Sequence, residues 1–223
     1  MNIILLLLSF SLFAQEDINS NRELIFEENF RGPINTQIWN VENPDLVEIS
    51  PKNKLILKNE YIPILKETRS GRLNTKNKFD FKYGFIELKV HIPLVKGLLP
   101  EVMLKSIGPW PSLDIELYKQ EKKKYHVTNA INWNRKGRVF NQIRQKKTSK
   151  LEPNSQNTYI FSLEWKPYEL IFSIDGKEVW RKFVQVKFMK SAFIDFYASF
   201  DEKIEENING EWAIDHIKIY KKL

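Results

Sequence analysis

The chain has 223 residues, of which 42% are apolar and 13% aromatic, and its formal charge is +7. This apolar content can bury a core, so length and composition exclude a disordered chain and indicate one domain or two small ones. Because the sequence has no cysteine and only three histidines, it excludes disulfides, thiol nucleophiles and cysteine-ligated metals, and it leaves little for a histidine-rich site.

The first segment has the pattern of a targeting signal. Residues 3–13 form an unbroken run of apolar residues and serine, followed by Ala14-Gln15 and the acidic pair Glu16-Asp17. The run is far shorter than the roughly 20 residues of a membrane-spanning helix. We expect a signal peptide over residues 1–14, cleaved near Ala14, a secreted or cell-envelope location and no membrane span. An uncleaved anchor is the alternative, because no Lys or Arg precedes the run.

From Leu24 onward the apolar residues alternate in short runs, and no helical period persists over ten residues. In the clearest run, Phe85 to Ile92, every second residue is aliphatic and the residues between are polar, which predicts a half-buried strand. The other predicted strands are residues 54–58, 158–165, 170–174, 177–181 and 212–220, the last with Ala213, Ile217 and Ile219 on one face.

Turn residues separate these runs. Asp175-Gly176 lies between two of them and is a strong signal for a two-residue hairpin. Around ten strands at short spacing, with no helix between them, predict an all-β fold, an antiparallel sandwich or jelly roll.

Basic residues are concentrated in one region. Between Lys119 and Lys150 there are eleven basic residues and a single acidic one, Glu121. Lysine-rich loops and strand edges that keep the protein soluble would explain this pattern. Attraction to a polyanion, such as a sulfated or uronic polysaccharide, is the functional alternative. Nucleic acid is disfavoured by the secretion signal.

Five stretches, in the same order along the chain, resemble glycoside hydrolase family 16. They are Phe26–Phe30 with Trp39, the block Ser70–Lys76 continuing through Gly84 and Glu87 to Pro93, Leu163–Pro167, Ile174–Lys177, and Ile214–Tyr220. The resemblance covers nearly all of residues 15–223 and implies a single domain, a two-sheet antiparallel β-sandwich of the concanavalin-like jelly-roll type. It also implies a concave sheet that grips a polysaccharide.

The stretch that resembles the catalytic strand of the family departs from its pattern. The family has E-x-D-x-E or E-x-D-x-x-E, and this chain has Ser112, Asp114 and Glu116. A retaining glycosidase needs a nucleophilic carboxylate roughly 5 Å from an acid/base carboxylate. By resemblance Glu116 is the acid/base, Asp114 the middle carboxylate and Ser112 the substituted nucleophile position. A serine without an adjacent base is a poor replacement, so double displacement should fail.

Four further residues are candidates for sugar binding. Trp110 and Trp133 flank the catalytic stretch and could stack on sugar rings, with core packing as the alternative. Arg72 could bind a sugar or hold a carboxylate in a salt bridge. Asn132 stands where relatives carry histidine. The family tryptophan that precedes its Pro-Ala pair is Leu99 here.

These departures favour a secreted polysaccharide-binding protein with weak or no hydrolytic activity. The alternative is an active endo-acting glycosidase or transglycosylase on a β-glucan or a sulfated galactan, with Glu116 as acid/base and another carboxylate replacing the first Glu. An inverting mechanism would need a base and a water at wider spacing, roughly 6.5 to 9.5 Å. A third reading is an envelope adhesion protein that keeps only the jelly roll.

We expect no cofactor and assign no metal ligand, since the sequence has no nucleotide-binding motif. The resemblance implies that a structural calcium ion is compatible with the fold, but no ligand cluster in the sequence places one. The expected partner is a polysaccharide, anionic if the basic region takes part; we expect a monomer that binds no nucleic acid.

Overall fold

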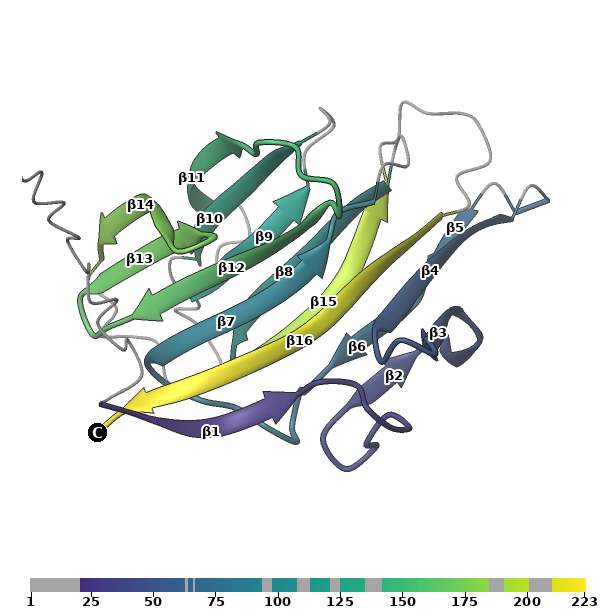
Figure 1. The fold of residues 1–223 in the computed structure, drawn as a ribbon, viewed down its shortest axis with the longest axis horizontal. Helices are drawn as coiled ribbons and strands as arrows, with labels where there is room; N and C mark the ends of the chain where they lie inside the picture. The colour runs from purple at the N-terminus through teal and green to yellow at the C-terminus, as the bar shows by residue number, and fades with distance from the viewer. Residues whose placement is uncertain are drawn as a thin grey trace, which may run out of the picture.

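The computed structural model of the protein describes residues 21–62, 64–65, 67–93, 98–107, 113–120, 125–134, 142–184, 191–200 and 210–223. Within them the chain forms sixteen strands and one short 3-10 helix, η1 (Pro44–Leu46). The strands build two sheets that face each other (Figure 1), and the strand pairs of both sheets are antiparallel. The predicted fold class, an all-β antiparallel sandwich, is confirmed.

The first sheet has nine strands. Seven of them follow the order β14 (Lys177–Phe183), β13 (Glu169–Ile174), β12 (Thr158–Trp165), β7 (Gly84–His91), β16 (Gly210–Lys222), β4 (Leu55–Ile62) and β3 (Val47–Ile49). In addition, β1 (Arg22–Glu28) pairs with β16 and β5 (Glu67–Ser70) pairs with β4.

The second sheet has seven strands, and it holds the stretch that resembles the catalytic strand. Its order is β11 (Gln142–Lys150), β10 (His126–Asn134), β9 (Leu113–Gln120), β8 (Leu98–Ser106), β15 (Ala192–Phe200), β6 (Arg72–Asn74) and β2 (Asn40–Glu42). Each side chain of this sheet points either into the sandwich or to the outer face, because side chains alternate along a strand.

The core lies between the sheets and follows the alternation predicted from the sequence. Ile86, Leu88 and Val90 of β7 are fully buried, whereas the polar residues between them are half-buried on the other face. Trp165 and Trp212 are each 1% exposed and pack in the same cluster. Burial of such side chains stabilises the fold by roughly 1.5 to 3 kcal/mol each.

The predicted hairpin at Asp175-Gly176 is confirmed. Both residues have positive φ, 48° and 77°, as a type I′ turn requires, and they connect β13 to β14. Asp175 also accepts a 2.8 Å hydrogen bond from the backbone N–H of Ile160, which fixes the turn against β12.

Two expectations about the strands were wrong. The sequence predicted around ten, and the additional ones include β2, β3 and β6, which have three residues each and are too short to show an alternating pattern. In β16, Ala213 does not share a face with Ile217 and Ile219. A β-bulge between Ile214 and His216 reverses the alternation, so Ile214 joins the core in its place.

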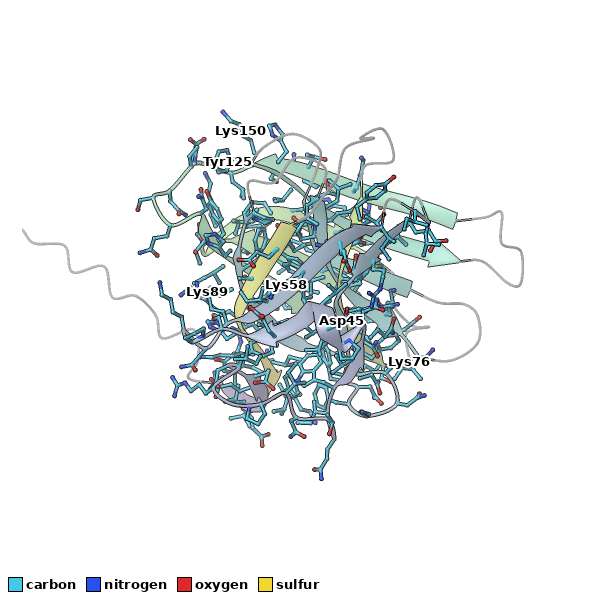
Figure 2. All side chains as sticks on the ribbon, turned by 90° about the vertical axis from the view of Figure 1, so that its right-hand side faces the viewer. Asp45, Lys58, Lys76, Lys89, Tyr125 and Lys150 are labelled. Carbon is cyan, nitrogen blue, oxygen red and sulfur yellow. The ribbon has the colours of Figure 1, made fainter. Side chains whose placement is uncertain are left out.

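The basic region maps in part to an edge strand. Strand β11 lies at the edge of the seven-stranded sheet, and its last residue, Lys150, pairs with His126 beside Tyr125 (Figure 2). Six of the eleven basic residues of the region, at positions 122–124, 135, 136 and 138, lie outside the described residues. No helix in the described part of the chain is long and apolar enough to cross a membrane.

Candidate functional site

Strand β9 places Glu116 on the outer face of the seven-stranded sheet. Its neighbours Ile115 and Leu117 are fully buried in the core, so alternation turns Glu116 to the other side. The carboxylate is nevertheless well covered, because Glu116 is only 4% exposed. A carboxylate at this depth depends on its hydrogen-bond partners.

One such partner comes from the adjacent strand. Asn132 Nδ2 donates a 3.1 Å hydrogen bond to Glu116 Oε1. In the ladder Asn132 lies opposite Asp114, and Ala130 lies opposite Glu116. The amide therefore reaches diagonally across the β9–β10 ladder. The structure thus brings together two of the residues that the sequence had selected, Glu116 and Asn132.

The other sequence candidates are placed less completely. Ser112 and Trp110 lie outside the described residues. For Asp114 in β9 and Trp133 in β10, the backbone is described and the side chain is not. Their proposed roles stay predictions.

A β-bulge directly follows Glu116. On β8, Met103 pairs with Glu116 and Val102 with Tyr118, so Leu117 has no partner in the ladder. Consequently Tyr118 points into the core, where its ring packs against Phe161 at a centroid distance of 4.7 Å. The bulge returns the next residue, Lys119, to the outer face, as bulges commonly do near functional sites.

Arg72 forms a bidentate ion pair with Asp195. The guanidinium Nε and Nη2 each donate a 2.7 Å hydrogen bond to one oxygen of the carboxylate. Asp195 is fully buried, and Lys105 Nζ lies 2.6 Å from its Oδ2. The second arm of Arg72 reaches Glu42 at 3.2 Å. The hydrogen bonds to Asp195 raise the pKa of Arg72 above its ordinary value, although partial burial opposes the shift.

The salt bridge suggested for Arg72 is therefore present. Whether Arg72 also contacts a sugar stays a prediction. Pairing of this geometry is strong and directional, which fits a positioning role in the sheet.

A second ion pair lies nearer to Glu116. Glu101 on β8 is 3% exposed and is paired with Lys119 Nζ at 2.8 Å. Beside it, the Tyr197 hydroxyl lies 3.2 Å from Met103 Sδ, and the Lys105 ammonium lies 4.9 Å from the centre of the Tyr197 ring. Burial raises the pKa of Tyr197 well above its ordinary value, and the negative charge of Glu101 adds to this. Tyr197 is therefore a neutral phenol at physiological pH.

We call these paired groups the ion-pair array. It consists of Glu42, Arg72, Asp195, Lys105, Glu101 and Lys119. Its three carboxylates are each held by at least one cation, so they are neutralised and fixed in position.

Sequence analysis missed most of this array. Asp195 and Tyr197 lie in β15 and Glu101 in β8, two strands in which no candidate site residue was predicted. In the sheet, β8 lies between β9 and β15. With this order known, alternation along the three strands would have placed Glu101 and Asp195 on the same face as Glu116. Without the strand order, that signal could not be used.

In the described part of the chain, no three histidine or carboxylate side chains lie close enough together to hold a metal ion. The outer face of the seven-stranded sheet offers hydrogen-bond donors, acceptors and fixed charges. Such groups orient a polar ligand that lies along a sheet.

The family model for glycosyl hydrolases family 16 matches residues 35–196. The chain belongs to glycoside hydrolase family 16. Among curated proteins, it is 40% identical over 42 residues to beta-1,3-glucan-binding protein 1 of Galleria mellonella, a match covering 19% of this chain and 9% of that protein. It is 25% identical over 115 residues to a beta-glucanase of Acetivibrio thermocellus, covering 51% of this chain and 32% of that protein. Less than a third of the length of either relative is thus matched.

Solved structures of family 16 share the fold. A family 16 endo-glucanase from Bacteroides ovatus superposes with a TM-score of 0.75 at 20% identity, over 87% of this chain and 99% of that one. A laminarinase from Flavobacterium sp. UMI-01 gives a TM-score of 0.73 at 18% identity, over 89% and 100% of the two chains. At these identities, the likeness supports the family 16 fold and leaves substrate and activity open.

Proposed function

We propose that this family 16 protein binds a polysaccharide on the outer face of its seven-stranded sheet and has weak or no hydrolytic activity. The observation that carries the proposal is the state of the carboxylates around Glu116. Glu101, Asp195 and Glu42 are each engaged by a cation, so none of them is a free nucleophile. Together with Ser112 at the nucleophile position, this favours binding over double displacement.

The same face is suited to hold a sugar chain. Fixed amide, carboxylate and ammonium groups are arranged across adjacent strands, and Tyr197 adds an aromatic ring among them. Rigid polar groups lose little entropy when they bind a ligand. The names of the curated relatives make a β-glucan the first ligand to test.

A second candidate function is inverting hydrolysis with Glu116 as general acid. It is favoured by the position of Asp195. Met103 on β8 pairs with Asp195 on one side and with Glu116 on the other, so the two carboxylates lie in one row across the sheet. Two strand spacings separate the backbones of Glu116 and Asp195 by about 9.5 Å. In inverting enzymes the two carboxyl groups are at most roughly 9.5 Å apart. The two cations on Asp195 oppose a role as base, because they stabilise its charged form.

The experiment combines binding and turnover on laminarin, mixed-linkage glucan, agarose and carrageenan. We expect saturable binding of wild type to at least one polymer, with no new reducing ends. Ser112→Glu should restore measurable cleavage, whereas its matched control Ser112→Ala should not. Turnover by wild type that disappears in both Glu116→Gln and Asp195→Asn would instead establish the inverting enzyme. Absence of binding to every polymer would refute both functions.

We propose an anionic polysaccharide as the alternative to a neutral β-glucan. Lys146 of β11 pairs with Ala130, which pairs with Glu116, so Lys146 lies in the same row of the sheet as Glu116. This lysine is exposed at the sheet edge, where it could meet a chain that crosses the strands.

We also propose that residues 1–14 direct export and are removed near Ala14. N-terminal sequencing of the protein recovered from outside the cytoplasm tests this. A mature chain that still begins at Met1 would contradict it.

A further inference from the structure

A cavity of about 620 Å³ lies at one end of the nine-stranded sheet and shares no residue with the ion-pair array. It is formed where β1 begins, β7 begins, β12 ends and β16 ends, next to the C-terminus (Figure 1). These four strands are neighbours, because β7 pairs with β12 and β16, and β16 pairs with β1. The volume is within the range of small-molecule sites in proteins.

The cavity is strongly basic. Five of its lining residues are cationic and one is acidic: Arg22, Lys82, Lys166, Lys221 and Lys222, against Glu164. Glu164 lies 3.3 Å from Lys166 and 3.8 Å from Arg22, and Lys166 also pairs with Glu169 at 3.3 Å. Lys82, Lys221 and Lys222 form no ion pair with any residue that the structure describes. A surplus of positive charge in a recess attracts anions.

Two buried N–H donors in the cavity lining also lack acceptors. Trp165 is 1% exposed, and its indole Nε1 has no hydrogen-bond partner among the described residues. The same holds for Nη1 of Arg22, whose guanidinium lies 4.1 Å from the centre of the Phe85 ring. Both atoms are covered by the surrounding protein, and leaving a buried donor without an acceptor is unfavourable.

The cavity lining is aromatic as well. Tyr83 and Phe85 line the cavity with Trp165, and the Tyr83 and Trp165 rings meet edge to face at a centroid distance of 5.5 Å. Aromatic rings pack against the apolar faces of sugar rings, and their edges and N–H groups leave polar contacts to the ligand.

We propose that this cavity is a second binding site, for a sugar unit that carries a carboxylate or a sulfate ester. The aromatic side chains contact the pyranose ring, and Arg22 with the lysines holds the anionic group. Trp165, whose ring packs edge to face against Tyr83, reports a ligand that contacts the Tyr83 ring. The site is independent of the polysaccharide face proposed above, because the two share no residue.

The test titrates the purified protein with glucuronic acid, glucose 6-sulfate, glucose and inorganic sulfate. Binding is followed by calorimetry and by the indole N–H signal of Trp165 in proton–nitrogen NMR spectra, assigned with Trp165→Phe. We expect the two anionic sugars to bind and to shift this signal, with affinity that falls as salt is added. Binding of one anionic sugar alone would identify the anionic group. Equal binding of glucose, or inorganic sulfate binding as tightly as the sugars, would overturn the proposal.

Surface variants keep the test decisive if Trp165→Phe does not fold. Lys82→Ala/Lys222→Ala should weaken binding of the anionic sugars about fivefold or more, since each exposed charge contributes modestly. Lys52→Ala/Lys177→Ala is the matched control, because it removes the same charge from exposed positions that do not line the cavity. Equal affinity in both double variants would refute the site. Loss of polysaccharide binding through Glu116 or Arg72 variants, with this binding retained, would separate the two sites.

Discussion

Asn132 donates its hydrogen bond to Glu116 from a position two pairs further along the β9–β10 ladder, opposite Asp114. The contact joins a buried carboxylate to an amide on the neighbouring strand. On the same face, Glu101 is held by Lys119, and Asp195 by Arg72 and Lys105.

Replacing Asn132 should therefore destabilise the fold through Glu116. We expect Asn132→Ala to lower the free energy of unfolding by about 1 to 3 kcal/mol, because a buried charged acceptor loses a donor. Urea denaturation measures this. In a double-mutant cycle with Glu116→Gln the two costs should couple by more than about 0.5 kcal/mol. Additive costs would show that the contact does not hold Glu116.

The Arg72–Asp195 pair should be far more important for stability than an exposed pair of similar geometry. Arg72→Ala leaves Asp195 fully buried with Lys105 as its remaining cation, and we expect a loss of about 2 kcal/mol. The control is Arg69→Ala, which breaks two pairs at the surface, with Asp45 at 2.9 Å and with Glu60 at 3.5 Å, and should cost less than about 1 kcal/mol.

The same variants decide between the two roles suggested for Arg72. If Arg72→Ala keeps the stability of wild type and loses polysaccharide affinity, the residue contacts the ligand. Arg72→Lys should not restore stability, since an ammonium cannot bind both oxygens of Asp195 in parallel.

The sequence predicted the architecture well because strong alternation survives wherever one face of a strand is buried. The residues of β7 and β12 show this, and Asp175-Gly176 fixed the hairpin between β13 and β14. The error at Ala213 has the opposite cause. A bulge changes the face of every residue beyond it, and no residue type near Asp215 marks its position.

The candidate site was predictable only along two adjacent strands, β9 and β10. Glu116 and Asn132 could be selected because the family resemblance identifies the catalytic strand and the strand after it. The ion pair between Arg72 and Asp195 joins residues 123 positions apart. Such a contact depends on β6 lying beside β15, and alternation within a strand carries no information about its neighbours.

Gly84 should not tolerate a side chain. Its φ is +131°, and a Cβ there would collide with the backbone carbonyl oxygen of Tyr220 on the paired strand. Gly84→Ala should therefore abolish soluble expression or lower the melting temperature by several degrees. Gly32→Ala is the control, since no atom lies within 4 Å of a Cβ at that position. Similar melting temperatures for the two variants would contradict this close approach.

Two buried tyrosines should make the fold sensitive to alkali. Burial raises the pKa of Tyr118 and Tyr197 above the ordinary value of 10.0. The unfolded chain therefore loses these protons at lower pH than the folded protein. Stability from these groups is complete below pH 10 and falls as pH rises above it. Denaturation between pH 9 and 11.5 should show a shallower decline in Tyr118→Phe than in wild type. An unchanged slope would indicate that the Tyr118 phenol ionises in the folded state.

Lys146 and Lys147 offer a sharp test of the anionic ligand. Both are exposed on β11, but Lys146 is in register with Ala130 and Glu116, whereas Lys147 pairs with Asn129 and points to the other face. If a sulfated or uronic chain crosses the strands beside Glu116, Lys146→Gln should weaken its binding about two- to fivefold and reduce the salt dependence. Lys147→Gln changes the net charge equally and should leave both unchanged. Affinity electrophoresis in carrageenan gels at several salt concentrations measures the difference. Equal weakening by both variants would mean that the protein attracts the polyanion through its overall charge, because a bound chain on one face distinguishes two adjacent lysines.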